Sequence, residues 1–314
     1  MIVTVTLNPS VDRTVALDRL ERGRVLRATS TRVDPGGKGI NVARALTGHG
    51  VKARAVLALG GPEGDHLGRL LAEAGVDVLS VRIAGSIRSN VTVVEPDGTT
   101  TKINEPGARL TREETATLIE VAVTAAADAQ WLVASGSLPP GAAETVYADL
   151  VAALAGTATR VGVDTSGPAL AASLSARPAL VKPNRLELQE CVGRPLRTLG
   201  DVVDACRTLC DRGALAVLAS LGSGGALLMD TTGVYHAHGP VAVPVSSVGA
   251  GDALLAGFLA AGGEGSEALI EAVAWGAAAV TLPGSRMPLP SDLRRGQVVL
   301  ERRPQLDLPL RDTA

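Results

Sequence analysis

The chain has 314 residues, of which 46% are hydrophobic, so it can bury a large core as one domain with at most a small appendage. Its 30 basic and 32 acidic residues leave a net charge of −2, and only 2% of it is aromatic. It therefore lacks the basic surface and the stacking residues of nucleic-acid-binding proteins.

No apolar run approaches the roughly 20 residues that cross a membrane. The N-terminal apolar run ends after seven residues, which is too short for a signal peptide. Three cysteines, Cys191, Cys206 and Cys210, form no CxxC pair, and their odd number indicates unpaired thiols in a reducing compartment. We therefore expect a soluble, cytoplasmic protein with no nucleic-acid or membrane partner.

In the first third of the chain, two segments interrupt an alternation of strands and helices. The predicted elements are a strand at 2–7, strand-like pieces rich in arginine within 15–33, a helix that opens after the glycines at 36–39, a strand at 53–59, a helix at 65–74, and a β-hairpin of 88–94 and 99–104. The hairpin and the earlier pieces do not fit a βαβ unit. We expect one domain, 1–314, with a small β-sheet lid from about 13–34 and 86–108.

From residue 111 the alternation resumes and runs to about residue 282. The predicted elements are helices at 111–127, 142–155, 167–175, 185–191, 198–212, 252–262 and 265–282, and strands at 131–134, 159–164, 179–182, 214–219, 226–229 and 233–238. This order predicts an α/β fold with a doubly wound, mostly parallel sheet flanked by helices. The last eleven residues, 304–314, lack a pattern and are expected at the surface.

Polar residues follow several of the predicted strands. They are Asp12, Ser137, Asp164, Lys182 to Asn184, Ser220 to Gly222, and the turn from Gly249 to Asp252. Each alone is equally well explained as a turn or a helix cap, as for Asn184 before the helix at 185–191. In a doubly wound sheet, ligands bind at the carboxyl ends of the strands, so their joint placement favours one ligand site.

The turn at 246–252 has the strongest local signal. The backbone N–H groups of Gly249, Ala250 and Gly251 precede a buried apolar helix, and a helix start suits an anion. Asp252 lies at or just before that start. There it either caps the helix or accepts a proton from a group that attacks the anion.

Common nucleotide and hydrolase motifs are missing from the sequence: there is no Walker loop, no GxGxxG after a strand and no GxSxG elbow. The close pair His236 and His238 has no third ligand nearby in sequence. We interpret it as one face of an exposed strand rather than a metal site.

The segments Gly36 to Ala43 and Val248 to Asp252 resemble the two signatures of the ribokinase-like, phosphofructokinase B family of sugar kinases. Further segments follow the order of that family: Thr6 to Asp12, Arg88 to Thr92, Ser135 to Pro139, Lys182 to Glu187 and Ser220 to Gly225. The resemblance covers nearly the whole chain. The first two of these further segments resemble the branch that acts on phosphorylated sugars, the 1-phosphofructokinases above all.

The resemblance implies a role for each matching residue. Asp252 would be the catalytic base, with the amides of Gly249, Ala250 and Gly251 on the transferring phosphoryl group. The sugar would be bound by Asp12, Gly36, Gly37, Asn41 and Ser137, and its phosphate by Lys38, Arg88 and Asn90. ATP would be bound by Lys182, Asn184, Ser220, Gly222 and Gly225, and Mg²⁺ by Asn184 and Glu187 through water. Lys102 is a weaker phosphate ligand, equally well explained as an edge-strand lysine.

The implied reaction is ATP- and Mg²⁺-dependent phosphorylation of fructose 1-phosphate to fructose 1,6-bisphosphate. Tagatose 6-phosphate and fructose 6-phosphate stay open as alternative acceptors, as does an unphosphorylated sugar or nucleoside. A non-catalytic sugar-phosphate sensor is a more remote alternative, because it would need neither a base nor metal ligands. Relatives of this kind are commonly dimers, so we expect a homodimer that forms through the lid.

Overall fold

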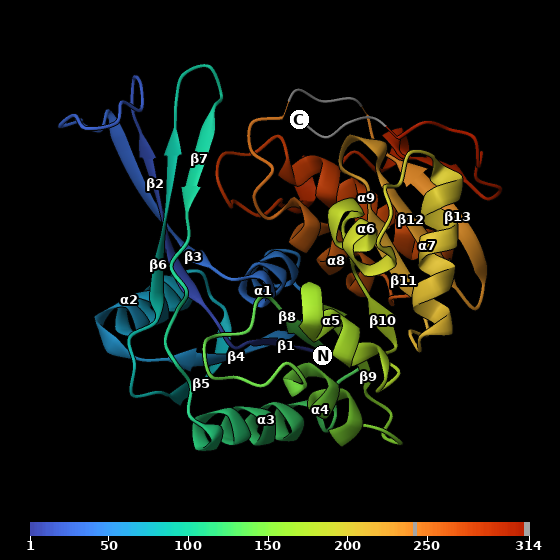
Figure 1. Cartoon of the computed structure of the whole chain (residues 1–314), viewed down its shortest axis with the longest axis horizontal. Helices are drawn as coiled ribbons and strands as arrows, with labels where there is room; N and C mark the ends of the chain where they lie inside the picture. The colour runs from blue at the N-terminus through green and yellow to red at the C-terminus, as the bar shows by residue number, and fades with distance from the viewer. Residues whose placement is uncertain (241–243, 311–314) are drawn as a thin grey trace.

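A computed structural model describes residues 1–240 and 244–310 (Figure 1). Its centre is a ten-stranded sheet in the order β14-β13-β12-β11-β10-β9-β8-β1-β4-β5, parallel from β11 to β5 and antiparallel from β11 to β14. The strands are β1 (Ile2–Thr6), β4 (Ala53–Leu59), β5 (Asp77–Arg82), β8 (Trp131–Ser135), β9 (Arg160–Asp164), β10 (Leu180–Val181), β11 (Val217–Ser220), β12 (Ala226–Asp230), β13 (Gly233–His238) and β14 (Val299–Glu301). The predicted doubly wound, mostly parallel sheet is confirmed.

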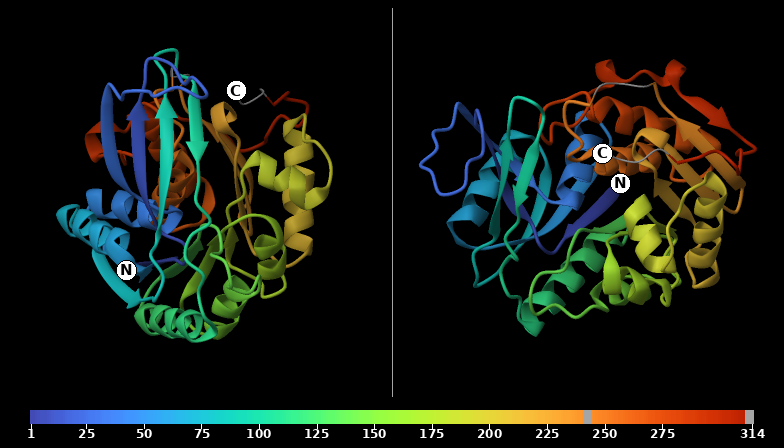
Figure 2. Two further views of the ribbon diagram at one scale, coloured as in Figure 1. Left: turned by 60° about the vertical axis from the view of Figure 1, so that its left-hand side comes forward. Right: turned by 45° about the horizontal axis from the view of Figure 1, so that its top comes forward.

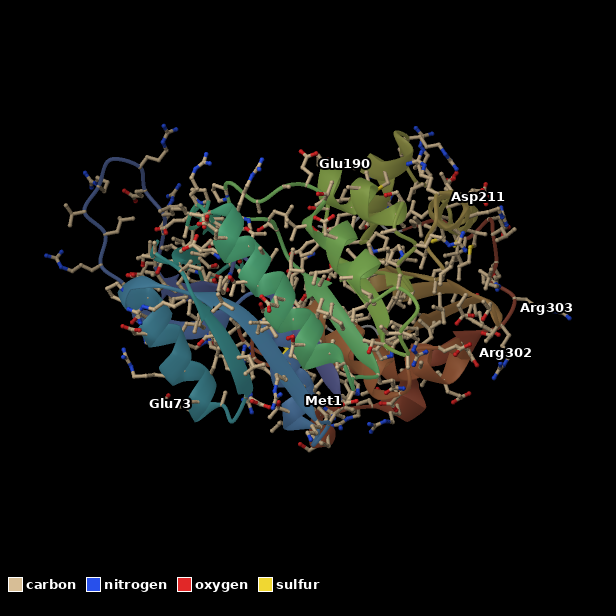
Figure 3. All side chains as sticks on the ribbon, turned by 90° about the horizontal axis from the view of Figure 1, so that it is seen from below. Met1, Glu73, Glu190, Asp211, Arg302 and Arg303 are labelled. Carbon is tan, nitrogen blue, oxygen red and sulfur yellow. The ribbon has the colours of Figure 1, made fainter. Side chains whose placement is uncertain are left out.

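Helices cover both faces of this sheet (Figures 1 and 2). They are α1 (Lys38–Gly48), α2 (Gly61–Glu73), α3 (Arg112–Ala126), α4 (Val146–Ala153), α5 (Gly167–Leu174), α6 (Arg185–Val192), α7 (Leu199–Asp211), α8 (Ala250–Ala260) and α9 (Gly265–Ala279). Side chains of β8 alternate between two cores: Leu132 packs with residues of α3 to α7, and Trp131 with residues of α8 and α9. Charged side chains such as Glu73, Glu190 and Arg303 point outward (Figure 3).

A second sheet of four strands stands apart from the main one, as Figure 2 shows. Its order is β3 (Ser30–Gly36), β2 (Ser10–Ala16), β6 (Arg88–Val94) and β7 (Thr100–Ile103). The predicted hairpin is confirmed, and the expected segments 13–34 and 86–108 supply most of this sheet. That it closes as a lid stays a prediction.

The structure corrects several expectations. Asp12 lies inside β2 of the small sheet rather than at the end of a parallel strand. Helix α2 begins at Gly61, because Pro62 in its first turn favours a helix where the glycines suggested a loop. Helix α4 begins at Val146 instead of residue 142. Helix α8 begins at Ala250, so Asp252 is the third helical residue.

The chain after α9 is more ordered than the sequence suggested. Strand β14 covers the edge of β13, so His236 is buried and faces Glu301 instead of lying on an exposed face. The amides of Leu199 and Gly200 bond to the carbonyls of Leu308 and Leu306, so the C-terminal segment packs against α7. Residues 311–314 lie outside the described part. Among the residues placed by the structure, no helix is both long and apolar enough for a membrane span.

Candidate active site

Two lysines and a carboxylate meet where the ends of β9 and β10 face the first turn of α1. Asp164, the last residue of β9, is fully buried. Its Oδ1 accepts from Lys38 Nζ at 2.8 Å, and its Oδ2 lies 3.2 Å from Lys182 Nζ. Lys38 Nζ also lies 3.5 Å from Glu187 Oε1. The lysines are therefore held side by side by one buried charge.

The charges in this group stabilise one another. Burial opposes the charged form of Lys38, yet the Asp164 and Glu187 carboxylates outweigh it and raise the pKa of Lys38. Burial likewise opposes ionisation of Asp164, but Lys182 and Lys38 lower the pKa of Asp164 below its ordinary value. Lys38 therefore stays cationic, and Asp164 holds both lysines in place, which suits phosphate oxygens.

Asp252 faces this group from the first turn of α8. It is 7% exposed, and its Oδ2 accepts from Asn41 Nδ2 at 2.8 Å. Burial, and secondly the negative charge of Asp164, raise the pKa of Asp252 to about 6. A carboxylate poised there is ionised at neutral pH and still basic enough to take a proton.

The turn before Asp252 is partly as predicted. Gly249 has φ 78°, which favours glycine, and a Cβ on Gly251 would lie 3.5 Å from Lys182 Nζ. The amide of Ala250 makes a long bond of 3.4 Å to the Ser247 carbonyl, so it is not fully free. The Lys182 ammonium therefore lies directly beside the backbone of the turn at Gly251.

Asn184 and Glu187 are a helix cap in this structure. Asn184 Oδ1 accepts from the Glu187 amide at 2.9 Å, and Glu187 Oε2 accepts from the Asn184 amide at 2.8 Å. Only Glu187 Oε1 is directed at the lysine group. No cluster of three or more His, Cys, Asp or Glu side chains that could hold a metal occurs among the described residues.

The glycine-rich turn after β11 adjoins this helix cap. Asn184 and Ser220 form a parallel bridge, and the Ser220 amide donates to the Pro183 carbonyl at 3.0 Å. Gly222 begins a short 3₁₀ turn, and Gly225 has φ 82° and no room for a Cβ against the Ala237 carbonyl. The predicted nucleotide residues are thus brought together.

Two of the predicted sugar residues, Asp12 and Gly36, form a second group on the small sheet together with Asn90. Asp12 pairs with Asn90 across the sheet, and Asp12 Oδ1 accepts from Asn90 Nδ2 at 2.9 Å and from Ser10 Oγ at 2.7 Å. A Cβ on Gly36 would collide with the Asp12 carboxylate, so any larger residue there would displace that side chain. Ser10 was not expected in this group, because a serine beside Asn8-Pro9 is typical of a turn.

Arg88 and Asn90 keep unused polar atoms. Arg88 donates from Nη2 to the Asn8 carbonyl and from Nη1 to the Glu105 carbonyl, both at 3.1 Å. Within the described part of the chain, Arg88 Nε and Asn90 Oδ1 are buried without a hydrogen-bond partner. Arg88 also lines a cavity of about 360 Å³ between Glu63, the segment 86–89 and the loop 105–107. A ligand could satisfy these atoms.

Not every predicted neighbour lies where expected. Lys38 contacts Asp164 and Glu187, whereas the other expected phosphate ligands, Arg88 and Asn90, lie in the Asp12 group. Gly37 is the N-cap residue of α1 and has φ 128°. Ser137 is exposed beyond β8, 3.4 Å from Asn8 Nδ2. Lys102 is exposed on β7, opposite Thr92.

Comparisons with known proteins show the family and the fold of this chain. The sequence profile of the pfkB family carbohydrate kinases matches residues 5–292. A 1-phosphofructokinase from Xanthomonas campestris is 40% identical over 264 residues, which cover 82% of this chain and 83% of that protein. The crystal structure of phosphofructokinase-2 from Escherichia coli in complex with potassium has a TM-score of 0.87 and 37% identity, over 93% of this chain and 96% of that one. A tetrameric inhibited form of that enzyme has a TM-score of 0.81 at 37% identity, over 89% and 92%.

Proposed function

Because this chain belongs to the pfkB family of carbohydrate kinases, we propose that it transfers the γ-phosphoryl group of ATP to fructose 1-phosphate, which gives fructose 1,6-bisphosphate. The observation that carries this proposal is the buried Asp252, bonded to Asn41 and next to two lysines that Asp164 holds together. A base beside cations and a glycine turn is what phosphoryl transfer to an alcohol requires.

Asp252 accepts the proton of the attacking hydroxyl group as the new O–P bond forms and the bond to ADP breaks. The Gly249 and Gly251 amides and the Lys182 ammonium meet the charge on the transferring phosphoryl group. Contacts with Asp164 indicate that Lys38 acts there too, instead of on the phosphate already present in the substrate. Asn184, Ser220, Gly222 and Gly225 would bind the nucleotide.

The bonded group of Ser10, Asp12 and Asn90 would bind the sugar. Asp12 accepts from sugar hydroxyls, while the free Nε of Arg88 and Oδ1 of Asn90 offer a donor and an acceptor beyond it. Gly36, Gly37, Asn41 and Ser137 complete the sugar side. The small sheet would close over the substrate and exclude water, since water is a competing acceptor.

Magnesium fits the carboxylates present. Glu187 Oε1 makes no hydrogen bond within the helix cap and lies 3.5 Å from Lys38 Nζ. Glu187 and Asn184 would hold the ion through water, because Mg²⁺ keeps much of its hydration shell. When bound it would neutralise charge on the phosphates.

Association and location follow as further proposals. A homodimer through the small sheet remains our proposal, although the tetrameric form of the Escherichia coli relative shows that higher association occurs in that protein. The cytoplasm remains the proposed location.

Side-by-side kinetics with four acceptors test the substrate. We expect kcat/KM for fructose 1-phosphate to exceed that for fructose 6-phosphate, tagatose 6-phosphate and free fructose by tenfold or more, about 1.4 kcal/mol of transition-state discrimination. ADP release at fixed Mg²⁺-ATP gives the rates. If a 6-phosphate leads, the sugar binds the other way round. Binding of a ketose phosphate without turnover would support the sensor instead.

Arg88→Ala tests the phosphate end of the site. We expect KM for the phosphosugar to rise by roughly tenfold or more and KM for ATP to change less than about twofold, because a charge-assisted hydrogen bond is lost on one substrate only. Arg82→Ala, at an exposed position on β5, is the matched control. Equal effects on both KM values would contradict the assignment of Arg88.

A further inference from the structure

Arg44 lies on α1 three residues after Asn41, so both side chains share one helix face. Its Nη1 donates to Asn41 Oδ1 at 3.2 Å and to the Ser285 carbonyl at 3.1 Å, with a longer contact of 3.5 Å to the Pro35 carbonyl. The guanidinium group is thus fixed between α1, the end of β3 and the loop that follows α9.

These contacts decide which way the Asn41 amide points. Arginine can only donate hydrogen bonds, and an ionised carboxylate can only accept them. Arg44 therefore selects the oxygen end of the amide, which leaves the nitrogen end for Asp252. We propose that Arg44 is a positioning residue that holds Asn41 in the orientation in which its nitrogen donates to Asp252. This inference rests on the proposed role of Asp252 as the base.

The effect on Asp252 passes through the amide. Around Asp252, burial and the charge of Asp164 raise its pKa, and the bond from Asn41 and the charges of Lys182 and Lys38 lower it. Arg44 itself faces the charges of Asp34, Arg32 and Asp12, and burial lowers its pKa. Without Arg44 the amide is free to rotate about its last torsion, and the stabilising bond to the Asp252 carboxylate weakens.

Arg32 provides a matched control. It donates from Nη2 to the Pro283 carbonyl at 2.9 Å and pairs with Asp34 at 2.7 Å, so it anchors the same loop as Arg44. Within the described part of the chain, Arg32 makes no hydrogen bond to Asn41. Losing Arg32 removes a contact with the same loop and the pair with Asp34, but no contact with Asn41.

The test compares Arg44→Met with Arg32→Met by kinetics across pH and by thermal unfolding. We expect Arg44→Met to lower kcat by roughly fivefold or more and to move the acid limb of kcat/KM to higher pH, because Asp252 then holds its proton more strongly. Arg32→Met should leave the acid limb in place. An unchanged acid limb in Arg44→Met, or the same shift in both variants, would overturn the proposal.

A double-mutant cycle separates positioning from a structural role. In an Asn41→Ala background, Arg44→Met should change kcat by less than about twofold, because there is no amide left to orient. Additive effects would refute the proposal. If Arg44→Met does not fold, Arg44→Gln takes its place: its amide ends two bonds short of Nη1 and can accept as well as donate, so it no longer selects the oxygen end of Asn41, and a wild-type kcat and acid limb would also refute the proposal. Full activity of Asp252→Asn would instead remove the proposed function on which this inference rests.

Discussion

Replacing Asp252 with asparagine is expected to lower kcat by about 10² to 10⁴ while the protein stays folded. Asparagine keeps the shape and can still accept from Asn41, but it cannot take the proton of the attacking hydroxyl. Steady-state ADP release with fructose 1-phosphate measures the loss. A variant with more than a tenth of the wild-type kcat would remove Asp252 from the mechanism.

The same variant should unfold at a higher temperature than the wild type above pH 6. The folded-state pKa of Asp252 is raised from 3.8 to about 6, so ionising this buried group reduces the stability of the wild type. The sign follows directly: the contribution of Asp252 is most favourable below the ordinary carboxyl pKa and is lost as the pH rises through about 6. Thermal melts at pH 5 and pH 8 check this. A destabilised variant at pH 8 would mean that the loss of activity reflects damage to the fold.

Some of the signals that were local in sequence were interpreted correctly. Two glycines before an apolar run predicted the helix start near Asp252, and Asn184 before the helix at 185–191 was interpreted as a helix cap or a ligand residue. These motifs depend on the backbone within one turn, so the sequence contains the whole pattern. The role of Asn184 toward a metal stays a prediction. In the helix cap its Oδ1 already accepts from the Glu187 amide.

The contacts that define the chemistry are not local. Lys38 and Asp164 are 126 positions apart, and Asn41 and Asp252 are 211 apart. Asp164 could be noted as polar at a strand end, but nothing in its neighbourhood in the sequence shows that two lysines surround it. The grouping of Lys38 with Arg88 and Asn90 stays a prediction for the same reason, since charge type alone does not tell which phosphate a lysine meets.

Two corrections have the same physical origin. Asp12 was placed at the main sheet because β2 follows β1 after only three residues, yet that short turn leads into a different sheet. His236 was expected to be exposed because β14, some sixty residues later in the chain, was not foreseen as its cover. In both places the pairing partner of a strand, and not its own pattern, decides what its side chains face.

Asp164→Asn should cause the largest loss of stability of any substitution considered for this site, about 3–5 kcal/mol in the free energy of unfolding. Removing this one charge leaves the Lys182 ammonium, whose side chain is 5% exposed, without its buried counter-charge. Asp204→Asn is the control, because its pair with Arg207 has the same 2.8 Å distance as Lys38 and Asp164 but is about 60% exposed. The control should change stability by less than about 1 kcal/mol. Urea unfolding of both variants gives the comparison, and equal losses would mean that the buried charge has no special part in the fold.

The loss of stability in Asp164→Asn should be largest at high pH, whereas the contribution of Asp252 to stability falls as the pH rises. The pKa of Asp164 is lowered in the folded state, so its contribution is present above the ordinary carboxyl pKa and is lost as the pH falls below it. Its charge also raises the pKa of Asp252, so any activity left in Asp164→Asn should keep its acid limb at lower pH than the wild type. Arg44→Met is expected to move the same limb upward. Opposite shifts from Arg44, which acts through Asn41, and Asp164, which acts through its charge, would be hard to obtain from general loosening of the site, whereas two shifts in one direction would contradict the electrostatic account of the base.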